Sequence, residues 1–382
     1  MKLLVVAGEV SGDQHASALL AALRPRVSSL EVFGVGGDGM QAAGARLLAH
    51  QKDLAIIGLV EAFSKIRFAR RLIHALVCEA TREKADAAVL IDSPDFNLPL
   101  AKRLAKAGVP VVFYVSPQVW AWRKRRAKKI AKLARAVLVL FGFEKRWYDA
   151  RGLGERVTWV GHPLVDAAAA ELARPVPPPP AGVRRVVLMP GSRKGEVTSI
   201  LPVFRDAVGI LRKKVSGLEV VLVRADSISD ALLEELAGPA LADWRVVSGE
   251  HLALLAASDV LLVASGTATV EGLLARVPMV VVYKVHPVTF WIARRLVKVA
   301  DVAMANIVSD DGTGVRTVPE LLQEDATAEN VAAEAEKFLV DAALSAATRE
   351  RLAKGAADLG PPGVAVRTAE ALLAALGEGQ AA

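Results

Sequence analysis

Residues 2–13 read KLLVVAGEVSGD, a short apolar run that ends in two glycines four positions apart. Such a run is typical of a buried strand, and glycine allows the backbone to turn tightly where the run ends. Ser11 or Asp13 could then cap the following helix. We therefore expect a strand, a tight turn and a helix. The run is too short for a signal peptide.

The same alternation of apolar runs and helical patterns continues along the chain. The strands expected in the first half are Lys2–Ala7, Glu31–Val35, Ala87–Ile91, Val109–Tyr114, Ala136–Leu140 and Thr158–Val160. Those expected in the second half are Arg185–Met189, Glu219–Val223, Trp244–Val247, Val260–Ala264 and Met279–Val282. The helices expected between strands are Asp13–Leu23, Leu98–Ala107, Lys124–Ala134, Leu201–Val215, Leu252–Ala257 and Thr269–Ala275. This order indicates an α/β fold with parallel, doubly wound sheets covered by helices on both faces.

A proline-rich segment divides the chain. Residues 175–180 hold five prolines, which cannot continue a helix or a central strand. We expect two Rossmann-like domains, over residues 1–174 and 183–340, joined by a linker over 175–182 and separated by a cleft. Residues 341–382 should form a helical tail that crosses back to the first domain. Ligands of such folds lie at the carboxyl ends of the strands.

Composition narrows the class of protein. The chain has 382 residues, 53% hydrophobic and 23% charged, which suits two globular domains and argues against disorder. Its single cysteine, Cys78, excludes an internal disulfide and a cysteine-based zinc site. No apolar run reaches the roughly 18 residues of a membrane span. The net charge of +7 favours anionic partners, whether nucleic acid, acidic lipid or a phosphorylated substrate.

Two carboxylates follow a buried strand in the sequence IDSPDFN, residues 91–97. Pro94 biases Ser93 away from helix, so Asp95 is expected to open the next helix. A carboxylate near a second one, here Asp92, can have a raised pKa and act as a general base towards a sugar hydroxyl. Alternatively, Asp95 only caps the helix.

Glycines at 34, 36, 37 and 39 match the dinucleotide pattern G-x-G-x-x-G. The match raises the alternative of an NAD-dependent oxidoreductase. It follows the second strand rather than the first, and no acidic residue stands convincingly about 20 residues later. A glycine-rich loop facing the cleft, with Gly36 and Gly37 at its centre, is the favoured interpretation.

The sequence SPQVWAWR, residues 116–123, follows another strand. Its tryptophans could stack on a ligand or belong to the core and its rim. A basic stripe with an opposite apolar face at helical spacing then covers residues 124–135. A solvated helix face is the ordinary explanation of such a stripe, and a non-enzymatic RNA-binding protein is the alternative.

Two phosphate-type loops follow strands of the second half. Gly191, Ser192 and Arg193 supply glycine, a hydroxyl and a cation at a helix start. Ser265, Gly266 and Thr267 form a second such loop, and Glu271 one turn later could accept both hydroxyls of a ribose. Together they predict a nucleoside-diphosphate pocket.

These segments together resemble the lipid-A-disaccharide synthase family, inverting glycosyltransferases of the GT-B fold. The matching stretches, in order over nearly the whole chain, are AGEVSGD (7–13), GVGG (34–37), IDSPDFN (91–97), YVSPQVWAW (114–122), FE (143–144), VGHP (160–163), PGSR (190–193), ASGTA (264–268) and PELLQ (319–323). The resemblance implies transfer of 2,3-diacylglucosamine from its UDP derivative to the 6-hydroxyl of 2,3-diacylglucosamine 1-phosphate. The products would be a β(1→6) disaccharide and UDP.

The resemblance also implies roles for single residues. Asp95 would be the general base, Ser192 and Arg193 would hold the diphosphate with Lys284 and Asn306 nearby, and Thr267 and Glu271 would serve phosphate and ribose. The residues implied on the acceptor side or in the cleft are Gly8, Glu9, Ser11, Gly12, Asp13, Gly36, Gly37, Asp92, Ser116, Gln118, Trp120, Glu144 and His162. No metal, cofactor or nucleic acid is implied. The chain departs from the family pattern at Asp38, Gly142 and Ala305, and in a longer segment over 309–314, which affects the surroundings of Asn306.

Both implied substrates carry acyl chains, so we expect a cytoplasmic enzyme that binds the inner membrane peripherally. Leu59, Phe63, Ile66, Ala69, Ile73 and Leu76 repeat at helical spacing beside Lys65, Arg67, Arg70, Arg71 and His74. A second candidate surface is Phe290, Trp291 and Ile292 with Arg294, Arg295 and Lys298. Each could instead pack on its own domain. The sequence leaves open whether the protein forms a homodimer. It also leaves open the alternative that the protein is a UDP-sugar epimerase of the same fold. The histidines at 15, 50, 74, 251 and 286 show no ligand spacing and receive no function.

Overall fold

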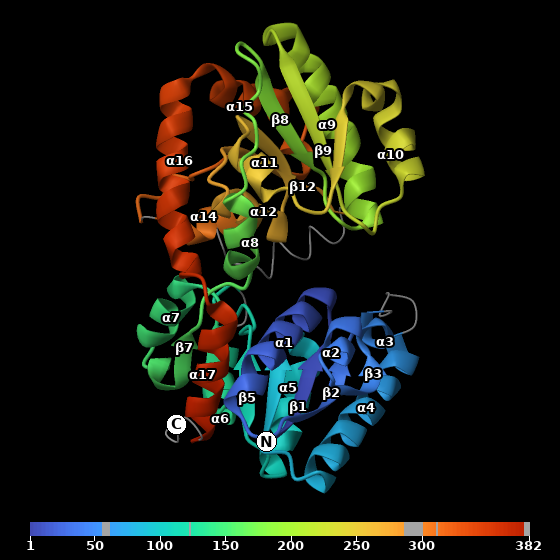
Figure 1. Ribbon diagram of the computed structural model, residues 1–382, viewed down its shortest axis with the longest axis vertical. Coiled ribbons are helices and arrows are strands. Elements are labelled where there is room, and N and C mark those ends of the chain that lie inside the picture. The colour runs from blue at the N-terminus through green and yellow to red at the C-terminus, as the bar shows by residue number, and fades with distance from the viewer. Residues whose placement is uncertain (56–61, 122–123, 286–300, 311, 378–382) are drawn as a thin grey trace. The chain divides into compact units, whose positions relative to one another are not determined.

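The computed structural model describes the chain except residues 56–61, 122–123, 286–300, 311 and 378–382. The chain forms two compact units (Figure 1). Unit 1 comprises Met1–Asp166 and Leu359–Ala382, and unit 2 comprises Ala167–Asp358.

Unit 1 is built on a seven-stranded parallel sheet with the order β3-β2-β1-β4-β5-β6-β7. Its strands are β1 (Lys2–Ala7), β2 (Glu31–Gly36), β3 (Arg46–His50), β4 (Ala87–Ile91), β5 (Val111–Tyr114), β6 (Ala136–Val139) and β7 (Val157–Trp159). Its helices are α1 (Val10–Leu23), α2 (Asp38–Ala42), α3 (Gln51–Ala55), α4 (Ala62–Arg82), α5 (Pro94–Lys106), α6 (Arg126–Leu133), α7 (Gly142–Asp149) and α17 (Val364–Leu376), while α8 (Leu164–Leu172) spans the boundary with unit 2.

Unit 2 repeats the plan with a six-stranded parallel sheet in the order β10-β9-β8-β11-β12-β13. Its strands are β8 (Arg184–Met189), β9 (Leu218–Arg224), β10 (Arg245–Ser248), β11 (Val260–Ala264), β12 (Met279–Tyr283) and β13 (Glu320–Leu322). Its helices are α9 (Lys194–Lys214), α10 (Asp230–Ala237), α11 (Leu252–Ala256), α12 (Thr267–Leu274), α14 (Met304–Val308), α15 (Ala328–Val340) and α16 (Ala342–Ala356). Two parallel-sheet α/β domains are therefore confirmed.

Burial on both faces explains the continuous apolar runs of the central strands. In β1, Leu4 and Val6 belong to a core that also holds Leu76 of α4, Leu100 of α5 and Ile130 of α6. The neighbouring Ala7 packs on the opposite face, where it lies against Gly12 of α1. Every strand of the sheet runs in the same direction, so the loops that follow the strands gather at one edge.

The C-terminal helix belongs to unit 1. The Asp166 carboxylate accepts hydrogen bonds from the backbone N–H groups of Gly363, Val364 and Ala365, which caps α17, and α17 packs against α1. The chain thus leaves unit 1 after Asp166 and re-enters it at Leu359, whereas the sequence placed domain limits at residues 174 and 340. The proline-rich segment over 175–182 falls inside unit 2.

The helix expected at a membrane is partly a core helix. Ile73 and Leu76 of α4 are buried in unit 1, so they cannot form the apolar membrane face that the sequence predicted. Phe68 is 42% exposed, and Arg67, Arg70, Arg71 and His74 are also exposed. Leu59 and the second candidate surface, residues 290–298, lie outside the described residues, as do the side chains of Phe63, Lys65 and Ile66. No helix within the described ranges is long and apolar enough to cross a bilayer.

Candidate active site

Asp92 and Glu9 follow neighbouring strands of unit 1. Ile91 of β4 is paired in register with Ala7 of β1, so the residues just beyond them share one edge of the sheet. Asp92 and Ser93 both adopt left-handed backbone, with φ of 48° and 42°. The buried Asn97 side chain holds this turn, because its Nδ2 donates to the carbonyls of Ile91 at 3.1 Å and Asp92 at 2.8 Å. Left-handed backbone at two successive non-glycine residues is strained, and such strain gathers at functional sites.

Asp92 has the electrostatics of a general base. Burial raises the pKa of its carboxyl to about 6, the negative charge of Glu9 adds to the rise, and a backbone hydrogen bond from Ser93 opposes it. The sequence predicted that Asp92 and Asp95 would influence each other. In the structure, the carboxylate that acts on Asp92 is Glu9.

Asp95 lies in a different environment from the one expected of a base. It is in the first turn of α5, its side chain is 81% exposed, and its Oδ1 lies 3.6 Å from Nη1 of Arg126 on α6. Asp95 therefore lacks the partial burial of Asp92. The geometry therefore makes Asp92, rather than Asp95, the better candidate for a general base.

Asp13 and the glycine-rich loop support each other. The buried Asp13 carboxylate accepts hydrogen bonds from the backbone N–H groups of Gly37 at 2.7 Å, Gly39 at 2.9 Å and Met40 at 3.0 Å. A Cβ at Gly37 or Gly39 would lie 2.8 or 2.7 Å from this carboxylate. These glycines, and Gly36 against Met40, are needed for packing within unit 1. A dinucleotide loop, which keeps its N–H groups for phosphate, is therefore not favoured here.

Other residues expected near the acceptor form hydrogen bonds within the interior of unit 1. Trp120 is buried and its Nε1 donates to Glu144 at 3.2 Å, while Glu144 also accepts from the backbone N–H groups of Leu140 and Phe141. Buried Ser116 lies 3.0 Å from the hydroxyl of Tyr148. Trp122 lies outside the described residues. Trp120 is thus a core residue, the second of the two possibilities that the sequence left open.

The remaining first-half candidates divide by exposure. His162 is buried, and its Nδ1 accepts from the Leu164 backbone N–H at 3.2 Å. Burial and then the nearby His15 lower the pKa of His162 to about 3, so the ring is neutral. Gly8 and Gly12 are buried at the strand end, and a Cβ at Gly8 would lie 2.5 Å from the hydroxyl of Ser93. Of these remaining candidates, Glu9, Ser11 and Gln118 are exposed.

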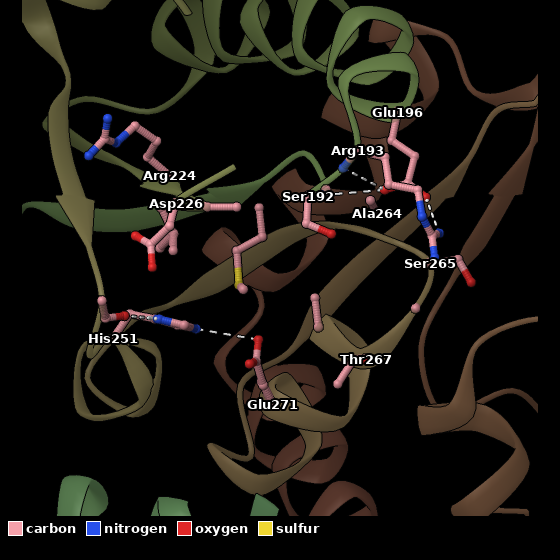
Figure 2. A pocket seen from close by; sticks show the side chains of 17 residues that line it. Ser192, Arg193, Glu196, Arg224, Asp226, His251, Ala264, Ser265, Thr267 and Glu271 are labelled. Atoms are coloured by element: carbon pink, nitrogen blue, oxygen red, sulfur yellow. Dashed lines mark hydrogen bonds and ion pairs between the residues drawn. The ribbon is translucent and has the colours of Figure 1, made fainter. Parts of the chain in front are cut away.

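Unit 2 contains a cavity of about 440 Å³ at the carboxyl ends of its strands. Its lining combines the two glycine-containing loops with polar side chains from β9 and the loops around it (Figure 2). The lining residues are Met189, Gly191, Ser192, Arg193, Glu196, Val223, Arg224, Ala225, Asp226, Gly249, His251, Ala264, Ser265, Gly266, Thr267, Ala268 and Glu271. All seven second-half candidates from Gly191 to Glu271 therefore share one cavity.

The first loop turns through Gly191, with φ of +111°, into α9. Glu196 closes this helix start, because its Oε2 accepts from the backbone N–H groups of Ser192 and Arg193, and its Oε1 binds Nη1 of Arg193 at 2.9 Å. The Arg193 side chain is still 78% exposed. The cation that the sequence assigned to the diphosphate is thus paired with a carboxylate of its own helix.

The second loop leaves its helix start open. Gly266 has φ of +150°, and among the described residues no side chain caps α12, whose first residue is Thr267. The backbone N–H groups at an uncapped helix start carry partial positive charge and suit an anion. Of the two loops, this one has the more accessible position for binding a phosphate.

His251 pairs with Glu271 across the cavity. Its Nε2 lies 3.3 Å from Glu271 Oε2, and its Nδ1 lies 2.6 Å from the carbonyl oxygen of Gly249 (Figure 2). Burial alone would lower the pKa of His251, but the hydrogen bonds to Glu271 and Gly249 and the charges of Glu271 and Glu171 together raise it. Both ring nitrogens face acceptors, which is the arrangement of a protonated imidazole.

Lys284 and Asn306 do not line this cavity. Lys284 follows β12, whereas Asn306 is buried in α14. Asn306 Nδ2 donates to Val318 O and Glu320 Oε1, and its Oδ1 accepts from the backbone N–H groups of Thr317 and Val318. Every hydrogen-bonding position of the amide is therefore filled by the protein, which fits a structural residue better than the expected ligand contact.

Sequence reasoning missed His251, Arg224 and Asp226. A lone histidine has no spacing signal, and arginine and aspartate are common on surfaces. The available signal was position, because each follows or ends an expected strand of unit 2 and so lies at the ligand-binding edge. Arg224 is held there by Ser248 and Asp230, at 2.9 and 3.0 Å from its guanidinium nitrogens.

Solved structures with the same fold are glycosyltransferases and epimerases. The crystal structure of CalG4, the calicheamicin glycosyltransferase, matches 100% of this chain and 99% of its own with a TM-score of 0.64 and 16% identity. The structure of S. aureus MnaA with UDP matches 99% and 97% with a TM-score of 0.65 and 12% identity. At these identities, the likeness establishes the GT-B fold alone.

Sequence comparison goes further. The profile of the family described as lipid-A-disaccharide synthetase matches residues 3–362. The lipid-A-disaccharide synthase of Anaeromyxobacter dehalogenans is 40% identical over 376 residues, which cover 97% of each chain. With the paired loops of unit 2 and the strand-end carboxylates of unit 1 in place, the chain belongs to the lipid-A-disaccharide synthetase family and is a glycosyltransferase.

Proposed function

We propose that this enzyme transfers 2,3-diacylglucosamine from UDP-2,3-diacylglucosamine to the 6-hydroxyl of 2,3-diacylglucosamine 1-phosphate. The products are the β(1→6)-linked disaccharide and UDP, formed with inversion. The observation that carries the proposal is the unit 2 cavity, where an uncapped helix start, a cation and an acid lie together. The names of the curated relatives support the choice of product.

The donor is held by unit 2. Its diphosphate lies at the start of α12, where the N–H groups after Gly266 and the Thr267 hydroxyl can donate to it. Arg193 adds a positive charge from the other loop. The Glu271 oxygen that does not face His251 can accept a ribose hydroxyl. Donors fixed in advance at the leaving diphosphate stabilise the charge that grows there in the transition state, and losing one commonly costs about 3 kcal/mol.

The acceptor hydroxyl is activated by unit 1. Asp92 takes the proton as the hydroxyl oxygen bonds to the anomeric carbon and the bond from that carbon to the diphosphate breaks. Attack from the side opposite the leaving group turns an α-linked donor into a β-linked product in one displacement. A carboxylate whose pKa lies near 6 is ionised at neutral pH and yet basic enough to assist, a role typically worth about 10²–10⁴ in rate.

The enzyme acts peripherally at the cytoplasmic face of the inner membrane. The exposed arginines at 67, 70 and 71 of α4 flank the exposed Phe68, which combines positive charge with one apolar side chain. Flotation with vesicles that contain anionic lipid, at low and high salt, tests this part. Equal binding to neutral vesicles at both salt concentrations would contradict the electrostatic contribution.

The decisive assay is UDP release from the diacylated UDP-glucosamine donor, with and without the monosaccharide phosphate acceptor. We expect release only when the acceptor is present, and a β(1→6) disaccharide by NMR. A UDP-sugar epimerase would change the donor without any acceptor, so donor conversion in the acceptor-free reaction would overturn the proposal.

A further inference from the structure

A second cavity lies in unit 1, between α5 and α6, which pack against each other. Its volume is about 390 Å³, within the range of small-molecule sites. We call it the α5–α6 groove. It is lined by Pro94, Asp95, Leu98, Pro99 and Lys102 of α5 and by Arg126, Lys129 and Leu133 of α6.

The groove carries unbalanced positive charge. Three cations line it, Lys102, Arg126 and Lys129, against one carboxylate, Asp95, so three minus one leaves a net charge of +2. Asp95 is 3.6 Å from Arg126, whereas neither lysine has an ion-pair partner within the described part of the chain. Three cations around one groove repel one another. A phosphate monoester carries about −1.5 to −2 at neutral pH and would offset this charge.

The groove walls are apolar as well as charged. Leu98, Leu133 and the two prolines line it beside the lysines. Arg126, Lys129 and Leu133 recur at helical spacing on one side of α6, whereas Ala127 and Ile130 on another side are buried in the core. The face towards the groove is therefore separate from the face that folds the domain. Charge beside apolar surface suits a phosphate attached to an acylated molecule better than inorganic phosphate.

The groove begins next to the proposed base. Asp92 stands two residues before Pro94, the first residue of α5 and the first of the lining. Lys102 lies seven residues beyond Asp95, which is about 10 Å along the helix axis. A molecule with a hydroxyl at Asp92 and a phosphate in the groove would thus extend along α5.

We propose that the α5–α6 groove binds the phosphate monoester of the acylated acceptor. The inference rests on the proposed function, and it assigns Arg126 and Lys129, two residues of the basic stripe, to substrate recognition. It also separates the two phosphate sites of the enzyme, with the donor diphosphate in unit 2 and the acceptor phosphate in unit 1.

The test compares two double variants of the full-length enzyme. Lys102→Ala/Lys129→Ala removes the two groove lysines. Lys106→Ala/Lys128→Ala removes one exposed lysine from each of the same helices, outside the groove lining, so the change in net charge is identical. Each is assayed for the acceptor KM at saturating donor, for the donor KM, and for equilibrium binding of the acceptor in detergent. The acceptor is 2,3-diacylglucosamine 1-phosphate, and the same sugar with a free 1-hydroxyl serves as the comparison ligand.

We expect the groove variant to raise the KM and Kd of the phosphorylated acceptor about tenfold or more, because two charge-assisted contacts are lost. Its donor KM and its binding of the dephosphorylated sugar should not change, and the control variant should stay within about twofold throughout. Equal losses in both variants would overturn the proposal, because diffuse surface charge would then be responsible. Equal losses with the dephosphorylated sugar would also overturn it.

Binding and turnover separate this inference from the proposed function. If the wild-type enzyme binds the acceptor but releases no UDP, and only the groove variant loses binding, the groove assignment holds and the proposed reaction fails. If UDP is released normally and both variants bind the acceptor equally, the proposed reaction holds and the groove assignment fails. Flotation on phosphatidylcholine vesicles containing phosphatidylglycerol identifies the rival occupant. Loss of flotation in the groove variant alone, with acceptor binding unchanged, would make the groove a lipid-headgroup site and overturn the proposal.

Discussion

Asp92 and Glu9 stand just beyond Ile91 and Ala7, two residues paired in register on adjacent parallel strands. Burial raises the pKa of Asp92 to about 6, and the charge of Glu9 contributes to the rise. Two segments more than 80 residues apart in sequence are thereby brought together at one edge of the sheet. This relationship, rather than the spacing of Asp92 and Asp95, supports the proposal that Asp92 is the base.

Replacing Asp92 by asparagine should abolish most turnover and leave UDP binding intact. The amide keeps the size of the side chain but cannot take a proton, so kcat should fall by about 10²–10⁴. Steady-state UDP release and calorimetric titration with UDP measure the two effects.

Asp95→Asn is the matched control, because it makes the same chemical change three residues away on an exposed side chain. It should retain kcat within about tenfold, since its exposed carboxylate lies beside Arg126 and is not the proposed base. If Asp95→Asn lost turnover and Asp92→Asn kept it, Asp95 would be the base, as the family resemblance implies.

Activity should depend on pH through Asp92. The base works only when ionised, so kcat/KM should fall as pH drops through about 6. Glu9→Gln removes a charge that raises this pKa, so the acid limb should move to lower pH. Because burial is the larger cause, the limb should not return to the value of an exposed aspartate. Profiles of kcat/KM from pH 4.5 to 8 measure the shift, and an unchanged limb would separate Glu9 from the base.

The sequence predicts the central strands to the residue, as in Lys2–Ala7, Ala87–Ile91 and Val260–Ala264. These strands are buried on both faces, so their apolar runs are continuous. It does not predict the edge strands β3, Arg46–His50, and β13, Glu320–Leu322. Both are short and partly exposed, and an edge strand needs apolar residues on one face at most.

The location of the site follows from the sequence, but the roles within it do not. Strand-end loops of parallel sheets meet at one edge, which predicts that Asp92, Ser192 and Thr267 lie near ligands. The charge of Glu9 acts on Asp92 where the backbone is left-handed at Asp92 and Ser93, and no residue pattern predicts that backbone conformation. The hydrogen bonds between Asp13 and the glycine-rich loop were also not predictable from the sequence, because they join residues more than 20 positions apart.

Asp13→Ala should destabilise unit 1. The change leaves the N–H groups of Gly37, Gly39 and Met40 without their acceptor, at a cost of about 2–4 kcal/mol. Asp13→Asn keeps one acceptor oxygen and should lose less. Urea unfolding followed by circular dichroism measures both. If Asp13→Ala unfolds at the wild-type midpoint but binds acceptor poorly, Asp13 contacts the ligand, and its structural role is secondary.

His251 should stabilise the protein in a pH-dependent way. A histidine whose pKa is raised in the folded state contributes stability that is fully present below its unfolded value, near 6.5, and is lost as pH rises through the folded value. His251→Gln should therefore lower the Tm by about 2–4 °C at pH 6 and by less at pH 9.

His50→Gln is the control for this pH effect. His50 also lies beside a carboxylate, 3.4 Å from Asp38, but that aspartate is 85% exposed, so the pair should contribute little at any pH. A Tm difference for His251→Gln that is constant from pH 6 to 9 would show that packing, and not the pair with Glu271, sets its contribution.

Arg193 and Glu196 should affect donor binding in opposite directions. Their side chains are 2.9 Å apart, so the guanidinium that could hold a diphosphate is shared with a carboxylate that repels it. Arg193→Ala removes the cation and should raise the Kd for UDP about tenfold. Glu196→Gln keeps an oxygen acceptor for the start of α9 but removes the negative charge, so the Kd should fall severalfold at low salt and less at high salt. Calorimetric titration at two salt concentrations measures both.

If Glu196→Gln weakens UDP binding as much as Arg193→Ala does, the carboxylate positions Arg193 for the ligand, and the competition inferred from the structure is wrong.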